Sequence, residues 1–211
     1  MKRSALAVAV SVLVATPLAY AGSADLGGSG WQAVWDVSLN PYVNITVDSV
    51  TSDAVSIRKS AEFIQGPDEF GFFPTIPITF QQTGPSSISR IIIVDETLKN
   101  STGVAWTDFH WDLLDGGDAW FIHDSGWSFA TSPMNNQQFT PDNHKFSVYG
   151  GVVAAGSVWT PGSGANGGEL VINAVSRAQA PYTTFILKET PTPEPASLLL
   201  IALGVLLLRR R

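Results

Sequence analysis

The chain of 211 residues has no cysteine and little positive charge. Without cysteine it forms no disulfide, carries no lipid on a thiol, has no thiol chemistry and holds no zinc ion through thiolates. Once Lys2, Arg3 and the three C-terminal arginines are set aside, seven basic side chains face 18 acidic ones, a formal charge of −11. This acidity disfavours attachment to anionic membranes by charge and predicts no nucleic-acid partner.

The chain also lacks the local patterns of common catalytic sites. No serine lies in a Gly-x-Ser-x-Gly turn, no histidine pair has His-Glu-x-x-His spacing, and no Gly-x-x-x-x-Gly-Lys loop is present. We therefore expect no enzymatic activity and no cofactor.

The N-terminus is typical of a cleaved secretory signal. Lys2 and Arg3 provide a positive region, and residues 5–15 provide an apolar stretch of the expected length. This stretch is too short to cross a hydrocarbon core of about 30 Å, which disfavours a membrane anchor. Ala19-Tyr20-Ala21 forms a small-residue cleavage site, so we place the cut before Gly22. Residues 1–21 thus predict export, with the Sec machinery and signal peptidase as partners.

The C-terminus has three parts in a fixed order. Pro193-Glu194-Pro195 precedes an apolar run over residues 196–208, and Arg209, Arg210 and Arg211 close the chain. A helix over this run would be about 20 Å long, and snorkelling arginine stems can extend its effective span. Basic flanks stay cytoplasmic, so the preceding domain would end outside. We expect a Pro-rich linker over 190–195, a transmembrane helix over 196–208 and a cytoplasmic tail over 209–211.

This three-part tail resembles the PEP-CTERM sorting signal of Gram-negative bacteria that make exopolysaccharide. The resemblance implies exosortase, a membrane protease, as a partner that recognises and cleaves near Pro193, Glu194 and Pro195. These residues and Arg209–Arg211 would then be recognition residues rather than catalytic ones. The resemblance also implies a transient stay in the inner membrane, followed by a place in the cell envelope, on the outer surface or outside the cell.

Between the two ends, residues 22–189 predict one all-β domain. Val43, Ile45 and Val47 alternate with polar residues, as expected for a half-buried strand, and no segment keeps a 3.6-residue period over three turns. The expected strands are residues 32–39, 42–50, 54–58, 76–81, 89–98, 104–113, 119–122, 145–151, 169–174 and 183–188. Gly/Pro turns between them favour an antiparallel β-sandwich, jelly-roll or Ig-like. Residues 22–30 predict a flexible Gly/Ser-rich leader.

Residues 106–127 are the densest group of aromatic and acidic side chains. If exposed, Trp106, Trp111 and Trp127 would be able to stack on sugar rings. Large aromatics more often fill the core of a sandwich, and we favour that interpretation.

Two weaker metal hypotheses involve the same region. Asp112, Asp115 and Asp118 surround a glycine turn and offer the oxygen ligands that calcium prefers, but they lack EF-hand spacing, and a solvated turn explains them equally well. His110 and His123 would be able to meet across a hairpin, and His144 is the third histidine, yet polar residues often meet there without chemistry.

Taken together, these features predict a structural or adhesive protein of the cell envelope or extracellular matrix, in an exopolysaccharide or biofilm context. One alternative is a secreted carbohydrate-binding or polysaccharide-modifying domain. Another is a calcium-dependent adhesion module.

Overall fold

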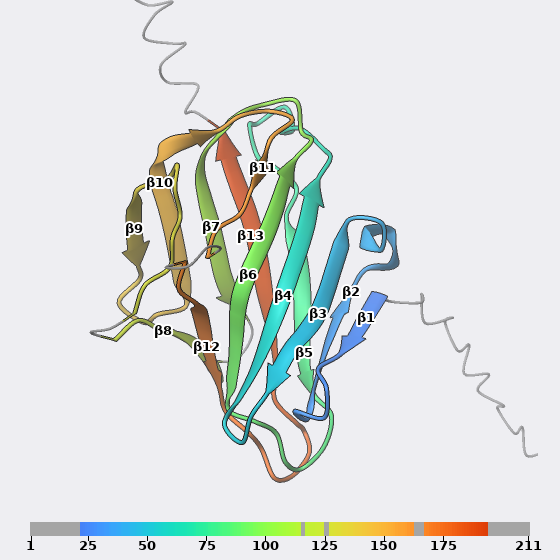
Figure 1. Ribbon diagram of the computed structural model, residues 1–211. Helices are drawn as coiled ribbons and strands as arrows, with labels where there is room; N and C mark the ends of the chain where they lie inside the picture. The colour runs from blue at the N-terminus through green and yellow to red at the C-terminus, as the bar shows by residue number, and fades with distance from the viewer. Residues whose placement is uncertain (1–21, 115–116, 125–126, 163–166, 194–211) are drawn as a thin grey trace, which may run out of the picture.

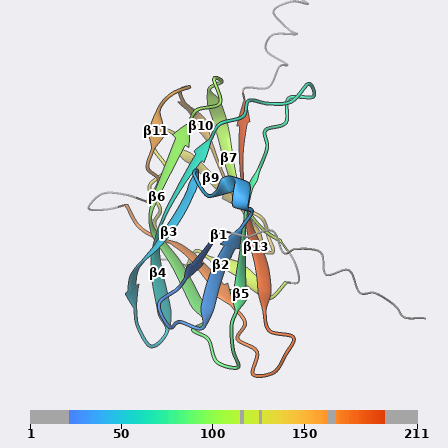
Figure 2. The same cartoon turned by 90° about the vertical axis from the view of Figure 1, so that its right-hand side faces the viewer.

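The computed structural model describes residues 22–114, 117–124, 127–162 and 167–193, and this part of the chain is a sandwich of two β-sheets (Figure 1, Figure 2). The seven-stranded sheet has the spatial order β1 (Gly22–Asp25), β2 (Trp31–Trp35), β5 (Ile76–Gln82), β13 (Thr184–Pro193), β7 (Trp106–Leu114), β10 (Lys145–Val153) and β9 (Asn136–Phe139). The six-stranded sheet has the order β3 (Val43–Val50), β4 (Ala54–Phe63), β6 (Arg90–Asn100), β12 (Leu170–Ala174) and β8 (Ala119–Ile122), with β11 (Val158–Trp159) beside β6. A short 3-10 turn, η1 (Val37–Leu39), connects β2 to β3.

Alternation of apolar and polar residues explains why these segments form strands that bury one face. In β5, Ile76, Ile78 and Phe80 are buried while the residues between them are not. The same period-two pattern runs through β2, β4, β7 and β12, and it brings the inner faces of both sheets into one hydrophobic core.

Aromatic rings fill one part of this core. Trp111 lies 4.7 Å from Phe109 and 5.1 Å from Phe146, measured between ring centroids. Phe63 of the six-stranded sheet lies 5.2 Å from Trp106 of the facing sheet, so edge-to-face contacts join the two layers.

The predicted all-β architecture is confirmed, and the paired strands are antiparallel with one exception. Strands β4 and β6 are parallel, with Ala54 opposite Arg90 and Phe63 opposite Asn100. The reason is that β5, which lies between them in sequence, belongs to the other sheet. The chain therefore crosses the sandwich twice and returns in its original direction. The narrower choice between a jelly-roll and an Ig-like sandwich stays a prediction.

Two expected boundaries differ from the structure. Residues 22–30 do not form a free leader, because β1 pairs with β2 and Leu26 is fully buried. Residues 190–193 are not a linker, because they are the last four residues of β13 and continue its pairing with β7.

The expected signal segment and C-terminal helix, with Ala19, Ala21, Glu194, Pro195 and the three arginines, lie outside the described residues. Within the described ranges, no helix is long and apolar enough to cross a membrane.

Prolines are tolerated at the end of β13 because the neighbouring strand β5 does not extend that far. Ile76, the first residue of β5, pairs with Glu189, and β13 continues to Pro193 with β7 as its partner. Pro191 and Pro193 thus lie where one lateral side of β13 has no strand beside it, and a missing N–H on that side breaks no ladder.

A chain that ends at Glu189 tests whether residues 190–193 belong to the fold. We expect its free energy of unfolding to be about 2 kcal/mol or more below that of a chain ending at Pro193. The shorter chain loses ladder hydrogen bonds and the buried Pro191. Urea denaturation of residues 22–189 and 22–193 measures the difference. Equal midpoints would show that these four residues are a linker after all.

Candidate functional site

Strand β13 lies in the middle of the seven-stranded sheet and leads into the C-terminal segment (Figure 1). It pairs with β5 on one side and with β7 on the other. Its buried residues alternate along the strand as Phe185, Leu187, Glu189 and Pro191. An ionisable side chain therefore occupies a core position four residues before the end of the described chain.

Glu189 is stable in the core because Lys59 and Glu96 contact it from the opposite sheet. Lys59 comes from β4 and Glu96 from β6, and all three side chains are inaccessible to solvent. Lys59 Nζ lies 2.5 Å from Glu96 Oε1 and 2.7 Å from both carboxylate oxygens of Glu189. The indole Nε1 of Trp111 donates to Glu96 Oε2 at 3.0 Å. We call Lys59, Glu96 and Glu189 the buried triad.

Burial and charge together decide how many protons the buried triad holds. Burial raises the pKa of Glu189 well above its ordinary value; Lys59 lowers it, and Glu96 raises it again through its charge and a hydrogen bond. Burial lowers the pKa of Lys59, but the charges of Glu189 and Glu96 outweigh it, and the pKa is raised. Burial thus favours the uncharged form of Glu189, while the two carboxyl neighbours favour the charged form of Lys59.

The buried triad connects the two sheets and has no access for a substrate. Ammonium and carboxyl groups removed from water are stable only when each finds a partner, and removing one partner typically costs about 3–5 kcal/mol. The triad therefore fixes which face of β13 points inward and its position along β4 and β6. This is a structural constraint on the strand that precedes the C-terminal segment.

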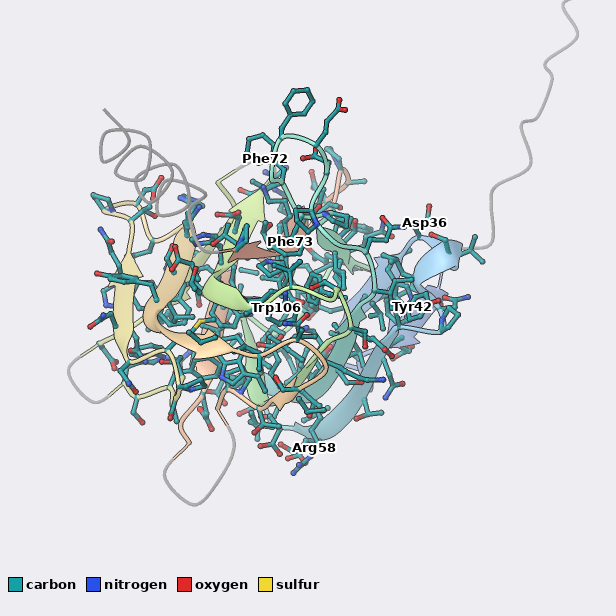
Figure 3. The ribbon with its side chains drawn as sticks, turned by 90° about the horizontal axis from the view of Figure 1, so that it is seen from above. Asp36, Tyr42, Arg58, Phe72, Phe73 and Trp106 are labelled. Atoms are coloured by element: carbon teal, nitrogen blue, oxygen red, sulfur yellow. The ribbon has the colours of Figure 1, made fainter. Side chains whose placement is uncertain are left out.

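A polar groove covers the outer face of the six-stranded sheet, at the strands that face the viewer in Figure 1. Two rows of side chains cross three strands there: Asn44, Ser60 and Thr97 in one row, and Thr46, Arg58 and Asp95 in the next. Tyr42 lies at one end, and the part of the groove beside it has a volume of about 310 Å³. Figure 3 shows Tyr42 and Arg58 at the periphery of the domain.

Sequence reasoning did not identify this groove. The alternation of Asn44 and Thr46 with buried Val43 and Ile45 indicates an exposed polar face of β3. It does not indicate that β6, about 50 residues away in the chain, would supply the third strand of the groove.

The tryptophan hypothesis is wrong for two of its three residues. Trp106 and Trp111 are fully buried in the aromatic core, where a sugar ring cannot reach their faces. Trp127 is partly buried, donates from Nε1 to the carbonyl oxygen of Glu169 at 2.7 Å, and packs against Phe139. The core interpretation explains Trp106 and Trp111, because large aromatics lose the most contact with water when they fill the space between the sheets.

The two described aspartates of the calcium hypothesis are paired with cations. Asp112 lies 3.5 Å from Lys145 Nζ and 3.3 Å from Lys188 Nζ, and Asp118 contacts the guanidinium of Arg177. Asp115 lies outside the described residues. Across the described ranges, no group of three or more His, Cys, Asp or Glu side chains is arranged to hold a metal ion.

The three histidines have separate partners. His110 Nδ1 lies 2.9 Å from Ser147 Oγ. Burial lowers the pKa of His110, and the positive charge of Lys145 lowers it further. His123 Nε2 lies 2.8 Å from Asn143 Oδ1, and its ring stacks on Phe139. His144 Nδ1 lies 3.3 Å from Asp142 Oδ2. The structure thus gives no pairing between His110 and His123.

Comparison with known proteins identifies the C-terminal end. Residues 191–211 match the family model of the PEP-CTERM protein-sorting motif. The chain carries a PEP-CTERM sorting motif. This motif implies export and exosortase-dependent sorting to the cell envelope or surface, with exosortase as the processing partner. No curated protein and no solved structure matches the chain.

The PEP-CTERM motif overlaps the folded domain. The match begins at Pro191, and Pro191, Thr192 and Pro193 are the last residues of β13. The first proline of the Pro-Glu-Pro signature thus pairs with Trp106 of β7, while Glu194, Pro195 and Arg209–Arg211 lie outside the described residues. The matched motif thus starts inside the central strand β13, without a linker before it.

The raised pKa of Glu189 predicts that the stability of the protein depends on pH. The pKa of Glu189 is raised on folding, so the stability that its proton provides is fully present below the unfolded value near 4.5 and is lost as pH rises toward the folded value. One proton gives a slope of at most about 1.4 kcal/mol per pH unit. Relative to a Glu189→Gln variant, whose amide does not titrate, we expect the natural protein to lose stability as pH rises above about 4.5. Urea denaturation at several pH values measures both proteins, and parallel profiles would contradict a raised pKa of Glu189.

Proposed function

We propose that this PEP-CTERM protein is a structural or adhesive component of the cell envelope or extracellular matrix, without enzymatic activity of its own. It passes through the inner membrane transiently, held by its C-terminal segment, and exosortase processes it near Pro193, Glu194 and Pro195. The observation that carries the proposal is that the sorting motif extends directly from β13, a central strand tied to the opposite sheet by the buried triad.

Two consequences of this connection support a structural role. The described strands all end by Pro193, so cleavage beyond that residue leaves both sheets complete. A load applied to the C-terminus acts along β13, which has antiparallel partners on both sides over residues 186–189. Many hydrogen bonds and the buried contact between Lys59 and Glu189 resist such a load together, which slows forced unfolding.

The polar groove favours carbohydrate binding as a second candidate function. Amide, hydroxyl and charged side chains of Asn44, Ser60, Thr97, Arg58 and Asp95 can bond sugar hydroxyls, and Tyr42 offers an aromatic ring at one end. Binding of exopolysaccharide there would make the domain adhesive in a matrix. It would also leave the sorting motif free, because the groove lies on the face of the other sheet.

The sorting proposal is tested by replacing Glu194 and Pro195, which follow the last residue of β13, with alanine. We expect this variant to remain an unprocessed, membrane-held precursor, because its recognition peptide is lost while its apolar segment and arginines stay. Intact-mass analysis of membrane and extracellular fractions from the native host measures the outcome. Pro85→Ala, which removes an exposed proline elsewhere, is the control. Normal maturation of the double variant would refute processing at this signature.

The adhesive role is tested by glycan binding at the groove. If the groove binds polysaccharide, Tyr42→Ala combined with Asn44→Ala should weaken binding at least tenfold, because the sugar loses a stacking ring and a hydrogen-bonding amide. Tyr149→Ala, at an exposed tyrosine of β10 in the other sheet, is the matched control. Titration across a panel of acidic and neutral bacterial polysaccharides measures affinity. Unchanged binding in the double variant, or none in the natural protein, would exclude the groove as the adhesive surface.

A further inference from the structure

The loop between β4 and β5 exposes two large aromatic side chains. We call residues 64–75 the aromatic loop. Phe70 is 75% exposed and Phe72 is 71% exposed, more than any other large hydrophobic residue in the described part of the chain. Phe73, next to them, is buried in the core and anchors the loop. Figure 3 shows Phe72 pointing away from the domain and Phe73 toward it.

The tip of the aromatic loop is an ordered turn built around Asp68. Its Oδ1 accepts hydrogen bonds from the backbone N–H of Phe70 at 2.9 Å and of Phe72 at 2.8 Å. The Asp68 N–H donates to the carbonyl of Phe72 at 2.8 Å, and its carbonyl accepts from Gly71. Gly71 has φ = +86°, which glycine adopts without strain. These bonds fix the backbone of the segment that carries both exposed phenylalanine rings.

The aromatic loop lies at the end of the sandwich where the sorting motif begins. Ile76, directly after the loop, pairs with Glu189, and β13 then continues toward the loop's end of the sheet as far as Pro193. Figures 1 and 2 show the loop and the tip of β13 at the same end of the domain. Val104 and Val158 are further exposed apolar residues near this end, beside the starts of β7 and β11.

The length of chain beyond β13 brings this end of the domain close to a membrane. The apolar run begins at Ala196, three residues after Pro193. Three residues span at most about 10 Å even when fully extended. If the apolar run is in the bilayer, as the proposed function requires, the end of the sandwich that carries Phe70 and Phe72 must lie at the bilayer surface.

We propose that, in the precursor, Phe70 and Phe72 insert into the outer boundary of the bilayer that holds the C-terminal segment. The occupant of this surface is phospholipid, contacted through apolar burial. Asp68 and Glu69 lie beside the rings, so the contact does not depend on anionic headgroups. Two rings bind a bilayer weakly by themselves, but the nearby C-terminal segment keeps their local concentration at the surface high. The second contact fixes the tilt of the domain and so the position of Pro193–Pro195 for cleavage.

The absence of cysteine makes a site-specific test direct. Glu69→Cys, next to Phe70, carries an environment-sensitive fluorophore in residues 22–211 reconstituted into phosphatidylcholine vesicles. Ser52→Cys, in the exposed β3–β4 turn at the far end of β4, carries the same label as the matched control. We expect a blue-shifted emission and quenching by spin-labelled lipid at position 69, and water-like emission with iodide quenching at position 52. When Phe70→Ala and Phe72→Ala are added, the label at position 69 should show water-like emission.

Each outcome has a distinct meaning. If the label at position 69 behaves like the label at position 52 while the chain floats with the vesicles, this inference is wrong and the proposed membrane stage stands. If the chain does not float at all, both are overturned. A blue shift that needs native membrane proteins, and is missing in pure lipid, would assign the loop to a protein partner and refute lipid insertion. Unchanged thermal unfolding of the alanine variants confirms that the exposed rings were removed without damage to the fold.

Discussion

The contact between Lys59 and Glu189 is the constraint on which the C-terminal half of this structure depends. Two carboxyl groups and one ammonium group lie between the sheets without solvent, and they are stable there because each has a partner and burial raises the pKa of Glu189. Glu189 cannot leave the core without removing one of the two carboxyl partners of the buried Lys59 ammonium group. The last strand is therefore fixed in register by chemistry as well as by its apolar residues.

This constraint explains how a sorting motif and a folded domain share residues. The end of β13 pairs with β7 on one side and has no strand beside it on the other, because β5 does not extend that far. Prolines that would disrupt the middle of a sheet are therefore accommodated there. The motif consequently begins at the surface of a rigid domain with almost no spacer. A short spacer restricts the distance and tilt of the domain, which makes the exposed phenylalanines of the aromatic loop relevant to the membrane stage.

Much of the strand pattern was predictable because it depends on neighbours two residues apart. The expected strands at 42–50, 76–81, 119–122 and 169–174 agree with β3, β5, β8 and β12 within one residue or so. The end of β13 was not predictable, because Glu189 and Pro191 interrupt the apolar alternation and resemble the start of a linker. The burial of Trp106 and Trp111 was expected from their size. The polar groove was missed because its rows combine strands that are distant in sequence.

The amino-acid sequence by itself determined the sorting motif, the acidic character, the absence of disulfides and the β-rich class, because each depends on composition or on short local patterns. The tertiary structure decided which strands share a sheet, which charges are buried and where the aromatic loop lies. Lys59 and Glu189 are 130 residues apart, and no local pattern relates them. They meet because the packing of two sheets brings their inner faces together, and a polar residue in such a core is stable only beside the partner that the fold delivers.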